Sequence, residues 1–123
     1  MMKRILISIV FSIVTFCLWA EEINVVIPTT KDTNYALYPV PTGVFLRLDT
    51  RDGTIIGIAP TNPKKSRMLN SRPLASDNKA GRFGLYPTDN IWEWILFDTT
   101  TGELWLLKWS AKNDILTKIN VEI

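Results

Sequence analysis

The chain contains two copies of one pattern, and this repeat constrains its fold more than any other feature. A Leu-Tyr-Pro motif ends at Pro39 and again at Pro87, and an Asp-Thr-x-x-Gly motif begins at Asp49 and again at Asp98. The motifs recur after 48 and 49 residues respectively. Such a period usually marks a supersecondary unit that cannot bury its apolar face alone, and solenoids need about three or more units. Two copies therefore predict the two halves of one small pseudo-symmetric domain.

Each unit, residues 35–59 and residues 83–109, is predicted to contain a β-hairpin closed by the Asp-Thr-x-x-Gly motif. The Asp carboxylate can accept turn N–H groups, and the Gly can adopt the left-handed conformation that closes the turn. This chemistry assigns a structural turn role to Asp49, Gly53, Asp98 and Gly102.

The second hairpin has a register that its charges support. If Asp98 pairs near Glu103, then Glu93 lies opposite Lys108, and opposite charges favour such cross-strand positions. Because strand side chains alternate between faces, this register gathers all the tryptophans of the hairpin on one face: Trp92, Trp94, Trp105 and Trp109.

The first hairpin has a weaker pattern but the same layout. Its register places Leu48 opposite Ile55 and Leu46 opposite Gly57. The small side chains of Gly57 and Ala59 leave room for a neighbouring tryptophan.

The rest of the chain adds strands and one long loop. Alternating or β-branched runs predict strands at Ile23–Ile27 and at Lys118–Ile123. Turn formers and six basic side chains predict a long basic loop over residues 60–82. No segment has a helical pattern, and the scattered prolines oppose one. The expectation is an all-β fold, a small antiparallel barrel or sandwich of about six or seven strands.

The N-terminus predicts export. Lys3 and Arg4 precede an apolar run that ends near Ala20, which is typical of a secretory signal peptide over residues 1–20. The remaining residues 21–123 would form a single domain in the periplasm, at the cell surface or in the medium. Membrane attachment would require an uncleaved signal segment or a lipidated Cys17.

Composition excludes several kinds of chemistry. The chain has no His and one Cys, so it cannot build a His-based nucleophile pair or a His-ligated metal site. We expect no metal and no cofactor. Removal of residues 1–20 would take away two of the 14 basic side chains and leave 12 facing 12 acidic ones. Bulk charge therefore gives no reason to expect nucleic acid as a partner.

Two features are candidates for binding. The tryptophans are either core residues, which we favour, or an exposed platform, in which case Trp92 and Trp109 would be exposed because they lie farthest from the turn. The basic loop could contact an acidic surface, or it could simply be a solvated loop. The candidate binding residues are Trp92, Trp94, Trp105, Trp109, Lys64, Lys65, Arg67 and Arg72.

Four carboxylates are candidates for catalysis by a hydrolase: Asp49, Glu93, Asp98 and Glu103. A glycosidase needs two carboxylates facing each other across a groove. Asp49 and Asp98 already have a turn role and Glu93 has Lys108, so we expect no enzyme and no catalytic residue.

One stretch has a family resemblance. The run from Arg82-Phe83-x-Leu85-Tyr86-Pro87 through the Trp92-x-Trp94 strand and the Asp98 turn to Trp109 resembles a hairpin of small, exported, uncharacterised bacterial proteins. Those proteins usually read Trp-Gln-Val-Gln-Trp after the turn, where this chain has Trp105-Leu-Leu-Lys-Trp109. The resemblance implies an exported protein built from hairpins, and it implies no activity.

These features together predict a non-catalytic exported binding protein. Its expected partner is another protein, a second copy of the chain included, in an accessory, inhibitor or immunity-type role. The alternatives are a carbohydrate-binding module that uses the clustered tryptophans and, less favoured, a carboxylate-dependent hydrolase.

Overall fold

The computed structural model describes Pro28, residues 30–110 and residues 114–123. This part of the chain is all-β, with eight strands and one short 3-10 turn, η1, at Pro63–Lys65. The strands are β1 Tyr35–Pro39, β2 Phe45–Asp49, β3 Ile55–Ile58, β4 Arg67–Asn70, β5 Phe83–Pro87, β6 Glu93–Asp98, β7 Leu104–Trp109 and β8 Asp114–Ile119.

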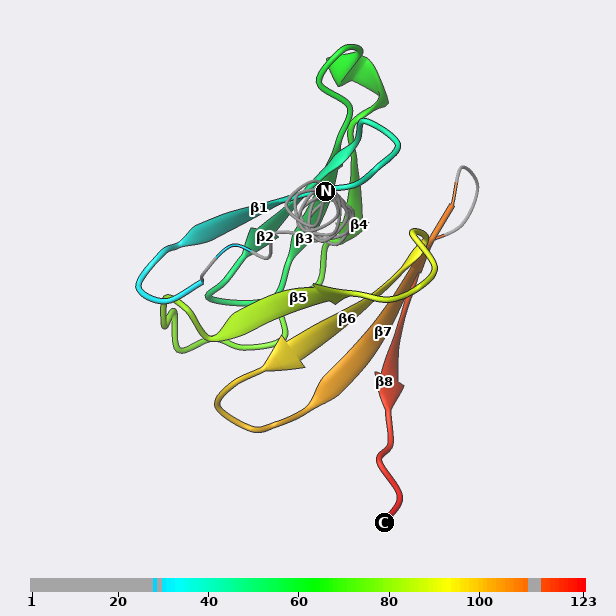
Figure 1. Cartoon of the computed structure of the whole chain (residues 1–123). Helices are drawn as coiled ribbons and strands as arrows, with labels where there is room; N and C mark the ends of the chain where they lie inside the picture. The colour runs from blue at the N-terminus through cyan, green and yellow to red at the C-terminus, as the bar shows by residue number, and fades with distance from the viewer. Residues whose placement is uncertain (1–27, 29, 111–113) are drawn as a thin grey trace, which may run out of the picture.

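The eight strands form two four-stranded antiparallel sheets that do not close into a barrel. The first sheet has the order β1-β2-β3-β4 and the second has the order β5-β6-β7-β8. Figure 1 shows the first sheet above the second. Tyr38 and Leu46 from the first sheet share one buried core with Leu85 and Leu96 from the second. The all-β prediction is confirmed. Of the two expected architectures, a barrel or a sandwich, the barrel is wrong, and the strand count exceeds the expected six or seven.

The hairpin registers are those that the sequence predicts. In the second sheet Glu93 pairs with Lys108 and Leu96 with Trp105. In the first sheet Leu48 pairs with Ile55. The outer pairs of the two halves also correspond to each other, since Tyr35 lies opposite Asp49 as Phe83 lies opposite Asp98. The two halves of the repeat are thus the same meander, residue for residue, over three strands.

The two sheets nevertheless turn opposite faces of the repeat toward the core. Tyr38 is buried, whereas its equivalent Tyr86 is exposed; Leu85 is buried, whereas its equivalent Leu37 is exposed. The same reversal holds along the next two strands. If a two-fold axis related the two sheets, equivalent faces would both point inward. Because opposite faces point inward, the second sheet is instead stacked on the first in the same orientation.

Two outer faces result, and both are rich in apolar side chains. The first outer face comprises the outward side chains Tyr35, Leu37, Phe45, Arg47, Ile56 and Ile58. The second outer face includes Tyr86, Ile95, Phe97, Leu104, Leu106 and the ion pair of Glu93 with Lys108.

The two Asp-Thr-x-x-Gly turns have the same backbone. In the first turn the Gly53 amide donates to the Asp49 carbonyl at 2.9 Å, and in the second the Gly102 amide donates to the Asp98 carbonyl at 2.8 Å. The glycines have φ values of 83° and 77°, the left-handed region that the turn requires. The turn role expected of these four residues matches this geometry.

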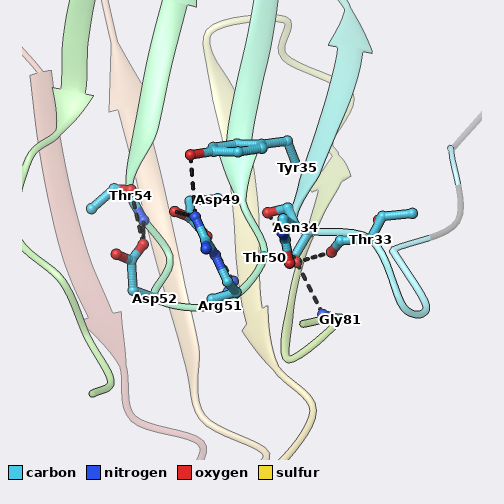
Figure 2. Close-up of polar contacts among 9 residues, drawn as sticks. All are labelled: Thr33, Asn34, Tyr35, Asp49, Thr50, Arg51, Asp52, Thr54 and Gly81. Atoms are coloured by element: carbon cyan, nitrogen blue, oxygen red, sulfur yellow. Dashed lines mark hydrogen bonds and ion pairs between the residues drawn. The ribbon is translucent and has the colours of Figure 1, made fainter. Parts of the chain in front are cut away.

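Thr50 ties the first turn to the chain on both sides of it (Figure 2). Its buried hydroxyl donates to the Thr33 carbonyl and accepts the Gly81 amide at 2.9 Å. The Thr50 carbonyl also accepts the Phe83 amide at 2.8 Å. The first turn therefore anchors the beginning of β5.

Two sequence-based expectations about the remaining segments need correction, and two lie outside the described residues. Residues 60–82 are not one loop, because they contain η1 and β4. Asn70, a residue typical of turns, ends β4 in the interior, where its side-chain Nδ2 donates to the Gly53 carbonyl at 2.8 Å. The last strand is Asp114–Ile119 rather than Lys118–Ile123, because Ile119 pairs with Leu104, the first residue of β7. Residues 1–20 and the strand expected at Ile23–Ile27 lie outside the described residues.

Candidate functional site

A cleft of about 480 Å³ joins elements from both sheets. One side is formed by the β1–β2 turn, β3, η1 and β4, and the other by the end of β7 and the loop before β6. Its lining residues are Val44, Gly57, Ala59, Lys65, Arg67, Leu69, Trp92, Trp109 and Ser110. We call this feature the tryptophan cleft.

Trp92 and Trp109 form the aromatic wall of the tryptophan cleft. Their rings meet edge to face, with centroids 4.8 Å apart and planes at 64°, an arrangement that aromatic pairs favour. The Trp109 amide donates to the Trp92 carbonyl at 3.0 Å, which fixes the two backbones together. Trp92 is 42% exposed and Trp109 is 6% exposed. The favoured interpretation as a core residue therefore fits Trp109, which Trp92 covers, and the alternative of an exposed ring fits Trp92 alone.

Trp109 carries a buried polar group. Its indole Nε1 is buried and has no hydrogen-bond acceptor among the described residues. In contrast, the indole Nε1 of buried Trp94 donates to the Ile91 carbonyl at 3.1 Å. A buried donor left unpaired costs about 1–3 kcal/mol.

The floor of the tryptophan cleft is made of small side chains. Gly57 and Ala59 lie on and just after β3, and the position equivalent to Gly57 in the second sheet is occupied by Leu106. A Cβ added at Gly57 would meet Leu69 Cδ1 at 3.4 Å, and the φ of Gly57 is not in the left-handed region. The backbone therefore does not require glycine here. What the missing side chain leaves is space between the sheets.

Two cations lie at the rim. The Arg67 guanidinium is held by Asp114 at 2.8 Å and also donates to the Ser110 carbonyl. Lys65 is exposed on η1 and has no ion pair within the described ranges. Lys65 is thus the rim cation that is available to a ligand.

The other candidate binding residues lie elsewhere. Trp94 is buried against Tyr38, with ring centroids 5.9 Å apart. Trp105 packs against Phe83 in the second sheet, with ring centroids 6.3 Å apart. Lys64 and Arg72 are exposed and do not line the cleft.

All four candidate catalytic carboxylates are engaged in ion pairs. The pairs are Asp49 with Arg51 at 2.9 Å, Asp98 with Arg82 at 2.8 Å, Glu93 with Lys108 at 3.8 Å and Glu103 with Lys118 at 2.7 Å. None of them lines the tryptophan cleft.

Asp98 is the most strongly held of these carboxylates. Its side chain is 2% exposed, and burial by itself would raise its pKa. Hydrogen bonds from the Arg82 guanidinium, the Thr100 amide and the Thr101 hydroxyl outweigh burial and lower the pKa of Asp98 to about 2. A carboxylate ionised this firmly is a poor general acid at neutral pH.

Two other features, a metal-binding cluster and a membrane-spanning helix, are absent from the described residues. No group of three or more His, Cys, Asp or Glu side chains there could hold a metal ion. No helix there is long and apolar enough to span a membrane.

No family model, curated protein or solved structure matches the chain. The geometry of the cleft is therefore the basis for proposing a function.

Sequence reasoning found part of the tryptophan cleft and missed the rest. It selected Trp92, Trp109, Lys65 and Arg67, which the fold brings together from positions up to 44 residues apart. It missed Leu69, because β4 lies inside the segment expected to be a loop. Leu69 follows apolar Met68 and precedes polar Asn70, so this short segment gives no periodic signal.

Proposed function

We propose that this chain is an exported, non-catalytic binding protein that holds another protein at the tryptophan cleft. The observation that carries the proposal is the convergence of Trp92, Trp109 and Lys65 on one cleft from distant parts of the chain. Aromatic side chains that are partly buried beside a cavity are typical anchors of protein interfaces.

The chemistry of the cleft suggests which part of a partner would enter it. Val44, Ala59 and the indole rings offer apolar contact, while Lys65 offers a positive charge without an ion-pair partner in the described residues. The buried Nε1 of Trp109 has no acceptor among the residues that the structure describes. An apolar side chain next to a carboxylate would satisfy these groups together. We therefore propose an acidic segment with one apolar anchor as the binding epitope.

The exposure of the aromatic pair favours a protein partner over a carbohydrate. Sugar rings stack on the flat faces of exposed aromatic rings. Only Trp92 of the pair has substantial exposure. A side chain inserted between the two sheets fits this cleft better than a sugar laid across it.

The first test is affinity capture from envelope extract of the native source, followed by binding measurements with the purified partner. Trp92→Ala and Lys65→Glu should each weaken that binding by about tenfold or more. Lys64→Glu is the matched control, since Lys64 carries the same charge one residue away and does not line the cleft. Its binding should equal that of the unmodified chain.

Two results would overturn the proposal. Equal loss of binding in Lys64→Glu and Lys65→Glu would mean that diffuse charge, not the cleft, holds the partner. Binding of a soluble glycan that depends on Trp92, with no protein partner captured, would establish the carbohydrate alternative instead.

A further inference from the structure

The two outer faces correspond, by position in the repeat, to the two faces that pack against each other in the core. The first outer face occupies the repeat positions that the second sheet turns toward the core. The second outer face occupies the positions that the first sheet turns toward the core. Each outer face is therefore the structural equivalent of a surface that is packed inside the same chain.

We propose that copies of this chain associate head to tail, with the first outer face of one copy packed on the second outer face of the next. The contact would repeat the packing between the two sheets within one chain. This surface is separate from the tryptophan cleft, so the inference does not rest on the proposed function.

The strongest support comes from Tyr38 and its equivalents. Within the chain, Tyr38 reaches from the first sheet to the second, where its hydroxyl accepts the Leu85 amide at 3.2 Å and its ring meets Trp94. The equivalents of Tyr38 and Leu85 are Tyr86 and Leu37. Both equivalents are exposed, at 43% and 50%. The residues needed to repeat this contact between copies are thus the same amino acids, and they are accessible.

The neighbouring positions preserve the same chemistry. The equivalent of Trp94 is Phe45, another aromatic residue, on the first outer face. In the single chain the Tyr86 ring lies against Gly84 and Phe97. Side-chain rotation would have to carry Tyr86 away from them to reach the next copy as Tyr38 reaches Leu85.

The space above the two turn glycines is a second, independent observation in favour of this contact. A Cβ added at Gly53 would lie 3.4 Å from Phe83 and 3.5 Å from Leu96, so the second sheet covers the first turn. A Cβ added at Gly102, the equivalent position, would meet nothing within 4 Å. The space over Gly102 is where the stacked copy would place the equivalents of Phe83 and Leu96.

Those equivalents are Tyr35 and Arg47, which introduce a charge at the proposed contact. The Arg47 guanidinium lies over the Tyr35 ring, 5.4 Å from its centroid. In the stacked arrangement this pair would cover Gly102, next to which Glu103 supplies a carboxylate on the surface. Arg51, which pairs with Asp49, also lies over the Tyr35 ring, 5.2 Å from its centroid. The charge of Arg47 would then face an opposite charge.

Head-to-tail contacts have a distinctive consequence for assembly. The two contacting surfaces are different, so each copy that joins presents another free surface and the chain of copies does not close. A face-to-face dimer would instead use one surface twice and stop at two copies. This difference makes the proposal separable from a symmetric dimer.

The experiment is sedimentation velocity of the purified protein, of Leu37→Lys and of Tyr86→Lys, each up to about 1 mM, where a millimolar Kd is half occupied. The unmodified protein should form a concentration-dependent series that extends beyond the dimer. Each variant alone should remain a monomer, because one of its two surfaces is blocked. An equimolar mixture of the two variants should form a 1:1 dimer and nothing larger, since each supplies the surface that the other lacks.

Ser71→Lys controls for added charge, because Ser71 is exposed in the loop after β4 and belongs to neither outer face. It should associate as the unmodified protein does. Far-UV circular dichroism checks that both face variants keep their sheets. A monomer at every concentration would overturn the proposal. So would a dimer that either variant abolishes and that mixing does not restore.

Discussion

Replacement of Asp98 by Asn tests how much the buried ion pair with Arg82 stabilises the fold. The pKa of Asp98 falls from its usual 3.8 to about 2 in the folded chain. Each unit of difference corresponds to about 1.4 kcal/mol, so the ionised carboxylate contributes about 2 kcal/mol at neutral pH. Asn keeps the shape but cannot balance the Arg82 charge. We expect Asp98→Asn to lower the free energy of unfolding by about 2–3 kcal/mol at pH 7.

The same pair makes a prediction about acid. Because folding lowers the pKa of Asp98, the unfolded chain takes up a proton at a higher pH than the folded chain does. The contribution is fully present above about pH 5 and is lost as the pH falls toward about 2. Urea unfolding at a series of pH values should show this loss in the unmodified protein. Asp98→Asn should lose about 2 kcal/mol less over that range.

Asp49→Asn is the matched control, since Asp49 holds the equivalent place in the first turn. Its partner Arg51 lies in the same turn, and both side chains are more exposed than Asp98. Burial would raise the pKa of Asp49, but the bonds from Arg51 lower it. We expect Asp49→Asn to cost about 1 kcal/mol or less. Equal losses in the two variants would refute the reasoning that burial makes the Asp98 pair the stronger one.

Two further predictions concern the turns and the sheet contact. Gly102→Ala should destabilise by about 1 kcal/mol, from backbone strain alone. Gly53→Ala should destabilise by more, because its Cβ would also come within 3.2 Å of Leu74 Cδ1; thermal unfolding that ranks the two in the opposite order would contradict this. Tyr38→Phe removes the acceptor of the Leu85 amide and should cost about 1–2 kcal/mol in urea unfolding, and no change would mean that water replaces the hydroxyl.

The sequence contained enough information for the hairpins. Both turns have side-chain chemistry that sets their geometry locally, and the opposite charges of Glu93 and Lys108 select one register. A shift by one residue would have moved every side chain to the other face. Register is therefore a local property here, and it could be predicted without knowledge of the fold.

The stacking of the sheets could not be predicted in the same way. Along β6 and β7 both faces are largely apolar, so alternation separates the two faces without saying which one is buried. Trp109 illustrates the difficulty, because distance from the turn suggested exposure, whereas Trp92 covers it. The tryptophan cleft could not be predicted for the same reason, since it exists only where the two sheets meet. The position of the rim residue Arg67 depends on β4, a four-residue strand in which apolar and polar side chains do not alternate.

The reversed faces also govern how the two halves of the chain can diverge. A substitution that suits the interior in one half falls on the surface in the other, as Arg47 in place of Leu96 illustrates. Strand positions in the two halves are therefore under opposite selection for polarity. The turns face the same demands in both copies. Resemblance between the halves should thus persist in the Leu-Tyr-Pro and Asp-Thr-x-x-Gly motifs long after the strands have ceased to match, and exchange of β2 with β6 should not yield a folded chain.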